Sequence, residues 1–149
     1  MKNDCAPIDD EAMIKLDNQV CFPVYSAANA VVRAYRPILD KLDLTYLQYL
    51  VMLTLWEKDG ISVKMLGARL HLDSGTLTPL LKRLEAKGLV LRMLSREDER
   101  IRVLTLTEQG NALKVQAYEV PKQMSCVLPL TLDEMITLRT LCNKIIDAV

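Results

Sequence analysis

Apolar residues recur at helical spacing along most of the chain, and the pattern is clearest from Asp73 to Leu84. Leu77, Leu80 and Leu81 lie three and four residues apart and Leu84 continues the series, so they share one face of a helix. Asp73 directly precedes the series and is a favourable N-cap residue. The stretch therefore predicts a helix that buries one face in a core.

The opposite face of this helix carries short hydroxyls at its start and two cations further along. Its outward residues are Ser74, Thr76, Thr78, Lys82 and Arg83. Such a face suits the major groove of DNA, although an ordinary surface helix has the same pattern. Because Pro79 cannot donate a backbone hydrogen bond, the helix is expected to begin either at Ser74 or at Thr78.

A long helix is predicted in the first third of the chain. Apolar positions at helical spacing run from Ala27 to Leu42, and Pro37 is expected to bend or end the helix near Tyr35. Residues 1–16 lack a clear cap and are expected to be partly mobile or to form a short first helix.

Two more helices are predicted between these two stretches. Thr45 and Gln48 form a capping box, and the helix that follows to about Lys58 is apolar nearly all round, which is typical of a central buried helix. Ser62 caps a short helix. Residues 71–73 join this short helix to the helix predicted up to Leu84. Two helices joined this closely, the second with a polar outer face, indicate a helix-turn-helix.

Two strand-like segments follow, at 89–94 and 102–106. The residues between them, 95–100, are few and mostly charged. A two-stranded ribbon with a charged tip, directly after a helix-turn-helix, indicates the wing of a winged helix. A solvated hairpin is the alternative, and the preceding helices favour the wing.

The C-terminal part of the chain predicts two further helices. Thr107 caps the first, which is expected to kink at Pro121 and to end before Pro129. Thr131 and Glu134 form a second capping box, which opens a terminal helix. The residues expected on its inward face are Met135, Leu138, Leu141, Cys142 and Ile145. The predicted fold class is therefore mostly α with a small β-wing.

Composition and charge fit one globular domain with an N-terminal extension. The chain has 149 residues, half of them hydrophobic, and its 19 basic and 19 acidic residues cancel. Neutrality argues against a promiscuous nucleic-acid coat protein, but a sequence-specific reader needs only a local basic patch. With no apolar run of about 18 residues and no signal peptide, we expect a cytoplasmic protein without a membrane segment.

The cysteines raise the question of redox chemistry. They are Cys5, Cys21, Cys126 and Cys142, with His71 as the only histidine. Because no Cys-x-x-Cys pair exists, no structural zinc or other metal site is expected. In a reducing compartment these thiols are either buried apolar residues or redox-active groups.

Four segments of the sequence resemble one family of regulators. They are LDNQVCF at 16–22, LTYLQYL at 44–50, LDSGTLTPLLKR at 72–83 and EDER at 97–100. Together with the order of helices and wing, they are similar to the organic-hydroperoxide-sensing repressors, OhrR, of the MarR family. The resemblance covers roughly residues 16–129.

This resemblance implies a homodimeric winged helix-turn-helix repressor that binds palindromic double-stranded operator DNA near a peroxidase gene. The DNA-binding part would be about 45–106, within a single domain at 17–149. Long N- and C-terminal helices, at 17–42 and 107–149, would form the dimer. The residues implied to face DNA are Ser74, Thr76, Thr78, Lys82 and Arg83, with Arg100 of the wing in the minor groove and Asp98 holding the wing. Such a protein needs no cofactor and is not an enzyme.

The resemblance also assigns Cys21 as the peroxide-sensing cysteine. Tyr35 and Tyr46 match tyrosines whose hydroxyls contact its sulfur, one of them from the partner subunit, and Tyr25 and Phe22 would line the pocket. The apolar lining would favour alkyl and fatty-acid hydroperoxides over hydrogen peroxide. The reactive form is the thiolate, which the positive end of a helix stabilises.

The start of that helix is marked by a proline. Pro23 is expected at the first helical position, with the helix beginning around Phe22, which leaves Cys21 at its positive end.

One branch of the family resolves the oxidised cysteine with a second cysteine in the C-terminal half of the other subunit, and Cys126 matches it. The implied product is an intersubunit Cys21–Cys126 disulfide. Cys142 is expected to be structural and Cys5 exposed and incidental. Three other functions remain open: a MarR-type regulator released by a phenolic ligand, a thiol peroxidase, and a winged-helix protein-interaction module.

Overall fold

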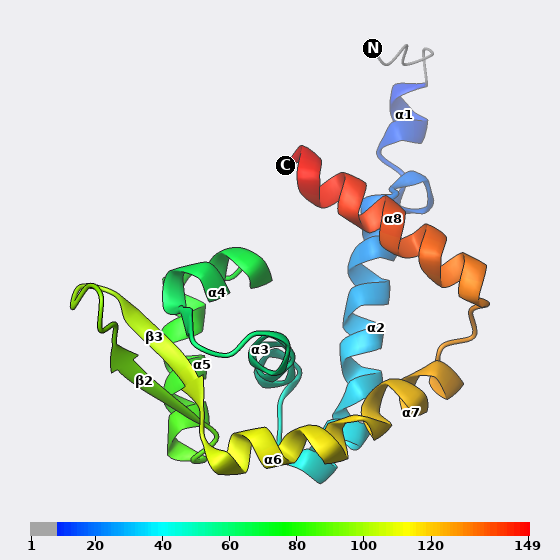
Figure 1. Cartoon of the computed structure of the whole chain (residues 1–149). Helices are drawn as coiled ribbons and strands as arrows, with labels where there is room; N and C mark the ends of the chain where they lie inside the picture. Colours follow the sequence, from blue (N-terminus) through cyan, green and yellow to red (C-terminus); the bar gives the residue numbers. More distant parts are fainter. Residues whose placement is uncertain (1–8) are drawn as a thin grey trace.

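The structure, a computed structural model, describes residues 9–149, and Figure 1 shows its arrangement. Cys5 lies outside the described residues, so its predicted exposure stays a prediction. In chain order the elements are α1 (Asp10–Met13), η1 (Leu16–Asn18), α2 (Cys21–Leu39), η2 (Asp40–Leu42), α3 (Tyr46–Glu57), β1 (Ile61–Ser62), α4 (Val63–Leu70), α5 (Ser74–Ala86), β2 (Val90–Leu94), β3 (Arg102–Leu106), α6 (Glu108–Ala117), α7 (Glu119–Val127) and α8 (Leu132–Ala148). The η elements are short 3-10 turns.

Helix α3 is the centre of the core, as predicted. Val51, Met52 and Leu55 on this helix are fully buried, and α4, α5, α6 and β3 pack around it. In Figure 1 it is seen end-on between α5 and α2. Two of its apolar residues, Leu47 and Leu53, remain exposed in the single chain, so α3 is not buried all round.

The predicted caps are present at five helix starts. In each case a side-chain oxygen accepts the backbone N–H three residues ahead, which satisfies one of the unpaired donors of the first turn. The capping residues are Thr45, Ser62, Asp73, Thr107 and Thr131. These caps explain why the predicted starts of α3, α4, α6 and α8 are correct, and the cap at Asp73 favours the earlier of the two starts that the sequence left open for α5.

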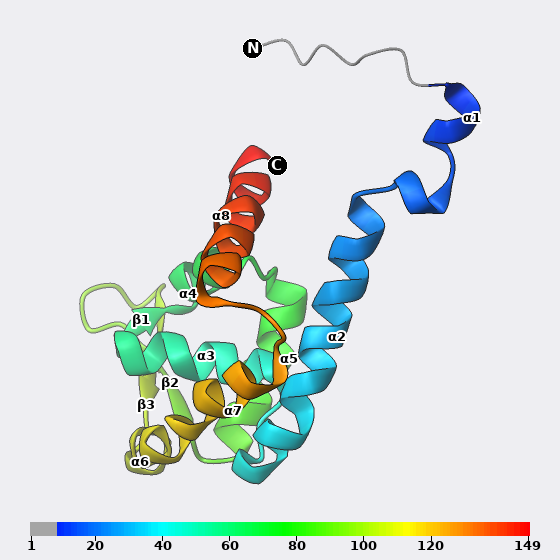
Figure 2. The same cartoon turned by 90° about the vertical axis from the view of Figure 1, so that its right-hand side faces the viewer.

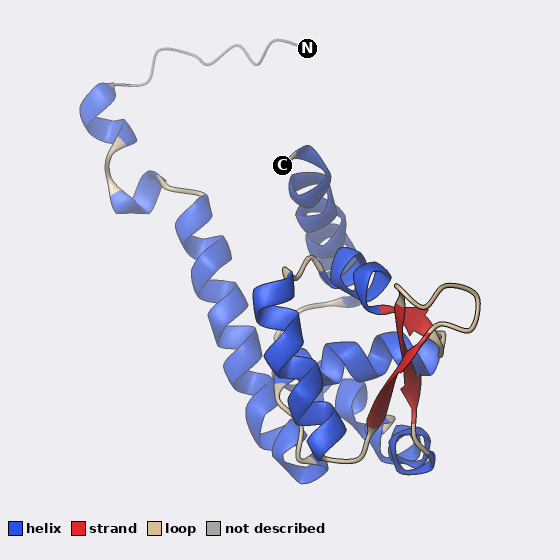
Figure 3. Ribbon diagram, turned by 90° about the vertical axis from the view of Figure 1, so that its left-hand side faces the viewer, coloured by secondary structure: helices blue, strands red, loops and turns tan. Residues whose placement is uncertain are grey.

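The wing contains one more strand than the sequence predicts. Strands β2 and β3 form the predicted antiparallel hairpin, but β1 pairs with β3 on the other side, giving the order β1-β3-β2 (Figure 3). Ile61 lies opposite Leu104 in this pairing. The extra strand anchors the base of the wing to the start of α4.

The prolines interrupt the helices less than predicted. The sequence predicts that Pro37 bends or ends the helix near Tyr35; α2 continues through Pro37 to Leu39, so the end is wrong. Helix α5 begins at Ser74 and includes Pro79, which excludes a start at Thr78.

The predicted kink at Pro121 lies slightly earlier, at Tyr118 between α6 and α7. Proline has no N–H, so Pro121 cannot bond the carbonyl of Ala117 four residues before it. The helix therefore changes direction at the carbonyl that loses its partner.

The N-terminal half of α2 and the whole of α8 extend away from the body (Figure 2). Helix α8 has no buried residue, and Leu138, Leu141 and Ile145, which were expected to face inward, are each about half exposed. The amphipathic pattern is real, but nothing within the described residues 9–149 covers its apolar face. Within residues 9–149 no helix is both long enough and apolar enough to span a lipid bilayer.

Candidate nucleic-acid interface and sensor site

Helix α5 presents the polar face that the sequence predicts. Leu77, Leu80, Leu81 and Leu84 are buried in the core. The exposed residues on the other side include Ser74, Thr76, Thr78, Lys82 and Arg83. One face of the helix thus anchors it, while the other is free to contact a ligand.

Asp73 fixes where α5 begins. Its Oδ1 accepts the backbone N–H of Thr76 at 2.7 Å, and this backbone hydrogen bond is the main cause that lowers the pKa of the Asp73 carboxyl. The charged cap holds the N-terminal hydroxyl residues in helical geometry. It also places a carboxylate at the positive end of the helix.

The tip of the wing is held together by its own backbone and by Asp98. The Asp98 Oδ1 accepts the N–H of Arg100 at 2.9 Å, and the Asp98 carbonyl accepts the N–H of Ile101 at 3.0 Å. The side chain of Arg100 is exposed and forms no ion pair within residues 9–149. Asp98 therefore shapes the turn that presents Arg100 to solvent.

An ion pair joins the wing to α5. The Arg92 Nε on β2 lies 2.7 Å from the Glu85 Oε2 on α5, and both side chains are largely shielded from solvent. Partial burial makes such a pair stronger than an exposed one. The helix and the wing are thereby fixed relative to each other.

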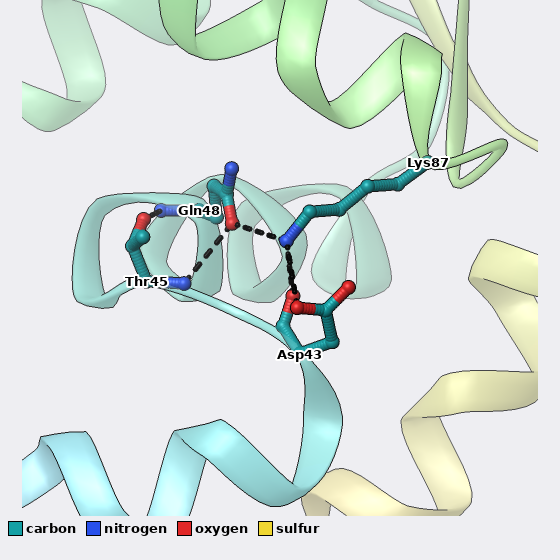
Figure 4. A network of polar contacts seen from close by, with 4 residues as sticks. All are labelled: Asp43, Thr45, Gln48 and Lys87. Carbon is teal, nitrogen blue, oxygen red and sulfur yellow. Dashed lines mark hydrogen bonds and ion pairs between the residues drawn. The ribbon is translucent and has the colours of Figure 1, made fainter.

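Lys87 joins the end of α5 to the start of α3 (Figure 4). Its Nζ donates to the Gln48 Oε1 at 3.2 Å and to the carbonyl oxygen of Asp43, whose carboxylate lies 3.4 Å away. The same Gln48 oxygen accepts the N–H of Thr45 at 3.0 Å, and the Gln48 side chain is almost completely buried. One amide oxygen thus serves the cap of α3 and the last turn of α5 together.

Cys21 is the first residue of α2 and is exposed. The helix begins one residue earlier than predicted, and Pro23 is the third helical residue rather than the first. Its missing N–H costs nothing there, because the first backbone donors of a helix have no partner in the helix. Val20 provides no side-chain cap, so no N-cap side chain bonds the first backbone N–H groups of α2, the helix that Cys21 opens.

A cluster of three tyrosines lies at the other end of α2. The rings of Tyr35 on α2 and Tyr46 on α3 have centroids 4.8 Å apart, and Tyr49 lies 5.9 Å from Tyr35. Burial raises the pKa of all three phenols. The sequence reading missed Tyr49, although it follows Tyr46 by three residues and so shares its helix face.

The predicted sensor residues do not meet within one chain. Cys21 and Tyr35 are fourteen residues apart on the same helix. At about 1.5 Å per residue, this separates them by about 21 Å along the axis. Phe22 and Tyr25 lie beside Cys21 and are exposed, so each chain carries two separate parts of the predicted pocket.

The described cysteines are all free thiols. Cys126 is exposed on α7, and Cys142 is half-buried on α8. The exposed position of Cys126 near the end of α7 leaves its sulfur accessible to another subunit.

The sequence matches known regulators. A family model described as transcriptional regulator SarA/Rot matches residues 33–116. The chain is 50% identical over 108 residues to the organic hydroperoxide resistance transcriptional regulator of Bacillus subtilis. The matched stretch covers 72% of this chain and 74% of the relative. The chain belongs to the MarR family of winged-helix transcriptional regulators.

A second relative is also a transcriptional regulator. The regulator TtmR of Methylorubrum extorquens is 55% identical over 119 residues, or 80% of this chain, which spans only 61% of that relative. These relatives are transcriptional regulators and not enzymes, as predicted. This chain is likewise a DNA-binding transcriptional regulator.

One solved relative has structures in several redox states. Reduced AbfR of Staphylococcus epidermidis bound to DNA is similar with a TM-score of 0.78 and 35% identity, covering 95% of this chain and 96% of AbfR. The disulfide form of AbfR has a TM-score of 0.61 at 34% identity, covering 93% and 92%. The overoxidised, DNA-bound form of AbfR has a TM-score of 0.76 at 33% identity, covering 95% and 100%, so the present MarR-family chain is closer in shape to both DNA-bound forms than to the disulfide form.

Proposed function

We propose that this chain forms a homodimeric repressor in the cytoplasm, which releases its operator when an organic hydroperoxide oxidises Cys21. The observation that carries the proposal is the separation of Cys21 from Tyr35 and Tyr46 along α2. Each chain has a thiol at the start of this helix and a tyrosine cluster at its end. Two chains are needed to bring the two parts together.

The exposed apolar residues supply a dimer interface. Many of them lie on the two arms that extend from the body, and large exposed patches mark interaction surfaces. They include Phe22, Val24, Tyr25 and Val32 on α2 and Leu132, Ile136, Leu138, Leu141, Ile145 and Ile146 on α8. A two-fold dimer covers both faces at once, because the same patch then occurs on both subunits.

In this dimer, Cys21 of one subunit meets the tyrosines of the other. Tyr35 and Tyr46 of the partner subunit would donate hydrogen bonds to the sulfur. Phe22 and Tyr25 would line the apolar side of the pocket from the thiol's own chain, which favours alkyl and fatty-acid hydroperoxides over hydrogen peroxide. The uncapped start of α2 places the partial positive charge of the helix terminus at Cys21, its first residue.

The reaction has two steps. The thiolate attacks one oxygen of the peroxide, the O–O bond breaks, and after one proton is taken up the products are a sulfenic acid and an alcohol. The thiol of Cys126 of the partner subunit then attacks the sulfenic sulfur and water leaves, giving an intersubunit disulfide. The smaller likeness of this chain to disulfide AbfR supports a change of shape at this step.

Helix α5 and the wing would read the operator. The hydroxyls of Ser74, Thr76 and Thr78 would approach base edges in the major groove. Lys82 and Arg83 would contact phosphate, and Arg100 would enter the minor groove. Two copies spaced by about one DNA turn would bind a palindrome, so a change in their separation weakens both contacts.

We expect the Cys21→Ser protein to bind its operator like the wild type but to stay bound when cumene hydroperoxide is added, because no thiol remains to be oxidised. A gel shift with and without peroxide measures this. Cys126→Ser should still oxidise at Cys21 but form no covalent dimer on a non-reducing gel, whereas the control Cys142→Ser should form it. Peroxide-driven release of the Cys21→Ser protein would contradict the sensor assignment.

A further inference from the structure

Tyr49 has a buried ring and an unused hydroxyl. Only 4% of the residue is exposed, and its ring packs at a tilt of 41° against that of Tyr35. The hydroxyl forms no hydrogen bond within the described residues, yet these contain no buried side-chain polar atom without a partner. The oxygen atom of Tyr49 therefore reaches the surface, although the ring beneath it does not.

The hydroxyls of Tyr35 and Tyr46 are in the same situation. Neither forms a hydrogen bond within residues 9–149, and neither is enclosed. Tyr46 and Tyr49 lie one turn apart on α3, and the ring of Tyr35 contacts both. Three phenols that form no hydrogen bond within residues 9–149 thus lie in one cluster, which the proposed dimer places at the thiol of the other subunit.

The proposed reaction needs a proton donor at the departing oxygen, and no residue has yet been assigned to this role. When the thiolate attacks a hydroperoxide, the departing oxygen leaves as an alkoxide and must gain a proton. Tyr35 and Tyr46 are assigned to the sulfur, so neither is assigned to the alkoxide. A donor at the departing oxygen speeds such a step, as in general acid catalysis.

We propose that Tyr49 is a catalytic residue of the sensor, and that its hydroxyl hydrogen-bonds the leaving oxygen of a hydroperoxide held at Cys21 of the partner subunit and gives it a proton. This assignment rests on the proposed function. The thiolate and the peroxide give a sulfenic acid and an alkoxide; the alkoxide takes the Tyr49 proton and becomes an alcohol. The phenolate then recovers a proton from water, so charge and atoms balance.

The environment of Tyr49 suits this role. Burial, together with the neighbouring Tyr35 and Tyr46, raises the pKa of Tyr49 to about 12. The phenol therefore keeps its proton at neutral pH, while it remains much more acidic than an alkyl alcohol. It is a stable donor before the reaction and a competent acid when the alkoxide forms.

The test compares two reactions of the same thiolate in the reduced, full-length Tyr49→Phe protein. Cumene hydroperoxide needs a proton on its leaving oxygen, whereas iodoacetamide alkylates the thiolate and releases iodide, which needs none. We expect the rate of Cys21 oxidation by the hydroperoxide to fall by about 100-fold or more, with the alkylation rate unchanged. Phenylalanine keeps the ring, and unchanged operator binding of the reduced protein verifies the fold.

Tyr118→Phe is the matched control, because Tyr118 is an exposed tyrosine outside the cluster, and it should leave both rates unchanged. Oxidation of Tyr49→Phe at the wild-type rate would overturn the assignment. An equal fall in both rates would also overturn it, since Tyr49 would then act on the thiolate. A wild-type protein whose Cys21 does not react with hydroperoxide would instead overturn the proposed function, and this proposal with it.

Discussion

The two halves of this molecule are built from similar amphipathic helices but complete their cores differently. In the proposed DNA-reading half, from α4 to β3, the apolar stripe of α5 is buried within the chain, and Leu81 is 0% exposed. In the proposed sensing half, which includes the extended helices α2 and α8, the stripe of α8 has a similar leucine-rich pattern, yet Leu141 is 54% exposed. One chain therefore completes the core of the proposed DNA-reading part, while the proposed sensor needs a second chain.

The difference explains how a redox signal would reach DNA. A DNA-reading part whose core is complete within one chain keeps its shape. In a dimer, only the relative position of the two DNA-reading parts is then left to change. A sensor site that is divided between two chains can control this relative position, because each site contains residues of both subunits.

The largest expected effect separates the two cores. Leu81→Ala should lower the free energy of unfolding by about 2–5 kcal/mol, because it leaves a cavity in a closed core. Leu141→Ala should cost little in the fold of each chain but raise the dimer dissociation constant by about tenfold or more. Denaturant unfolding and sedimentation at several protein concentrations measure both, and equal effects of the two variants would remove the distinction.

The second prediction concerns the wing alone. Arg100→Ala should weaken operator binding of the reduced protein by about tenfold, while the rate of Cys21 oxidation stays the same. Arg139→Ala, on exposed α8, is the control and should bind DNA normally. Fluorescence anisotropy with labelled operator gives the affinity. Unchanged affinity of the Arg100 variant would exclude the wing from DNA binding.

The smallest effect is expected at the junction of α5 with α3. Lys87→Met removes the charged donor to Gln48 and Asp43 but keeps most of the side-chain volume, so unfolding should become easier by about 1 kcal/mol. Lys64→Met, at an exposed lysine of α4, should have no effect in thermal unfolding. A Lys87 variant as stable as its control would mean that the junction contributes nothing.

Much of the reader was predictable because its signals are local. A hydroxyl or carboxylate three residues before a backbone N–H marks each cap, and Asp73 and Thr45 illustrate this directly. The buried stripe of α5 follows from spacing alone. The hairpin follows from two β-prone segments that flank a charged turn.

The remaining features depend on contacts that are distant in sequence. Strand β1 has two residues, and only its pairing with β3 defines it. Pro37 and Pro79 have strong local signals against helix, but the buried leucines of α5 and residues such as Ile38 and Leu39 hold the helices together.

For the same reason the sequence alone did not determine which residues come together at the proposed sensor site. Periodicity identifies an apolar face on α8 but not which chain covers it. The Tyr35–Tyr49 contact joins two helices, so spacing along α3 alone did not reveal it.

The most direct test of the central claim uses heterodimers that keep a single sensing thiol. In the first, a Cys21→Ser chain pairs with a Tyr35→Phe chain, so the remaining Cys21 lies in the chain that lacks Tyr35. In the second, a Cys21→Ser, Tyr35→Phe chain pairs with a wild-type chain. The oxidation rate of the remaining Cys21 by cumene hydroperoxide is measured in both. A sensor shared between subunits predicts the wild-type rate in the first heterodimer and a reduced rate in the second, and the reverse result would contradict it.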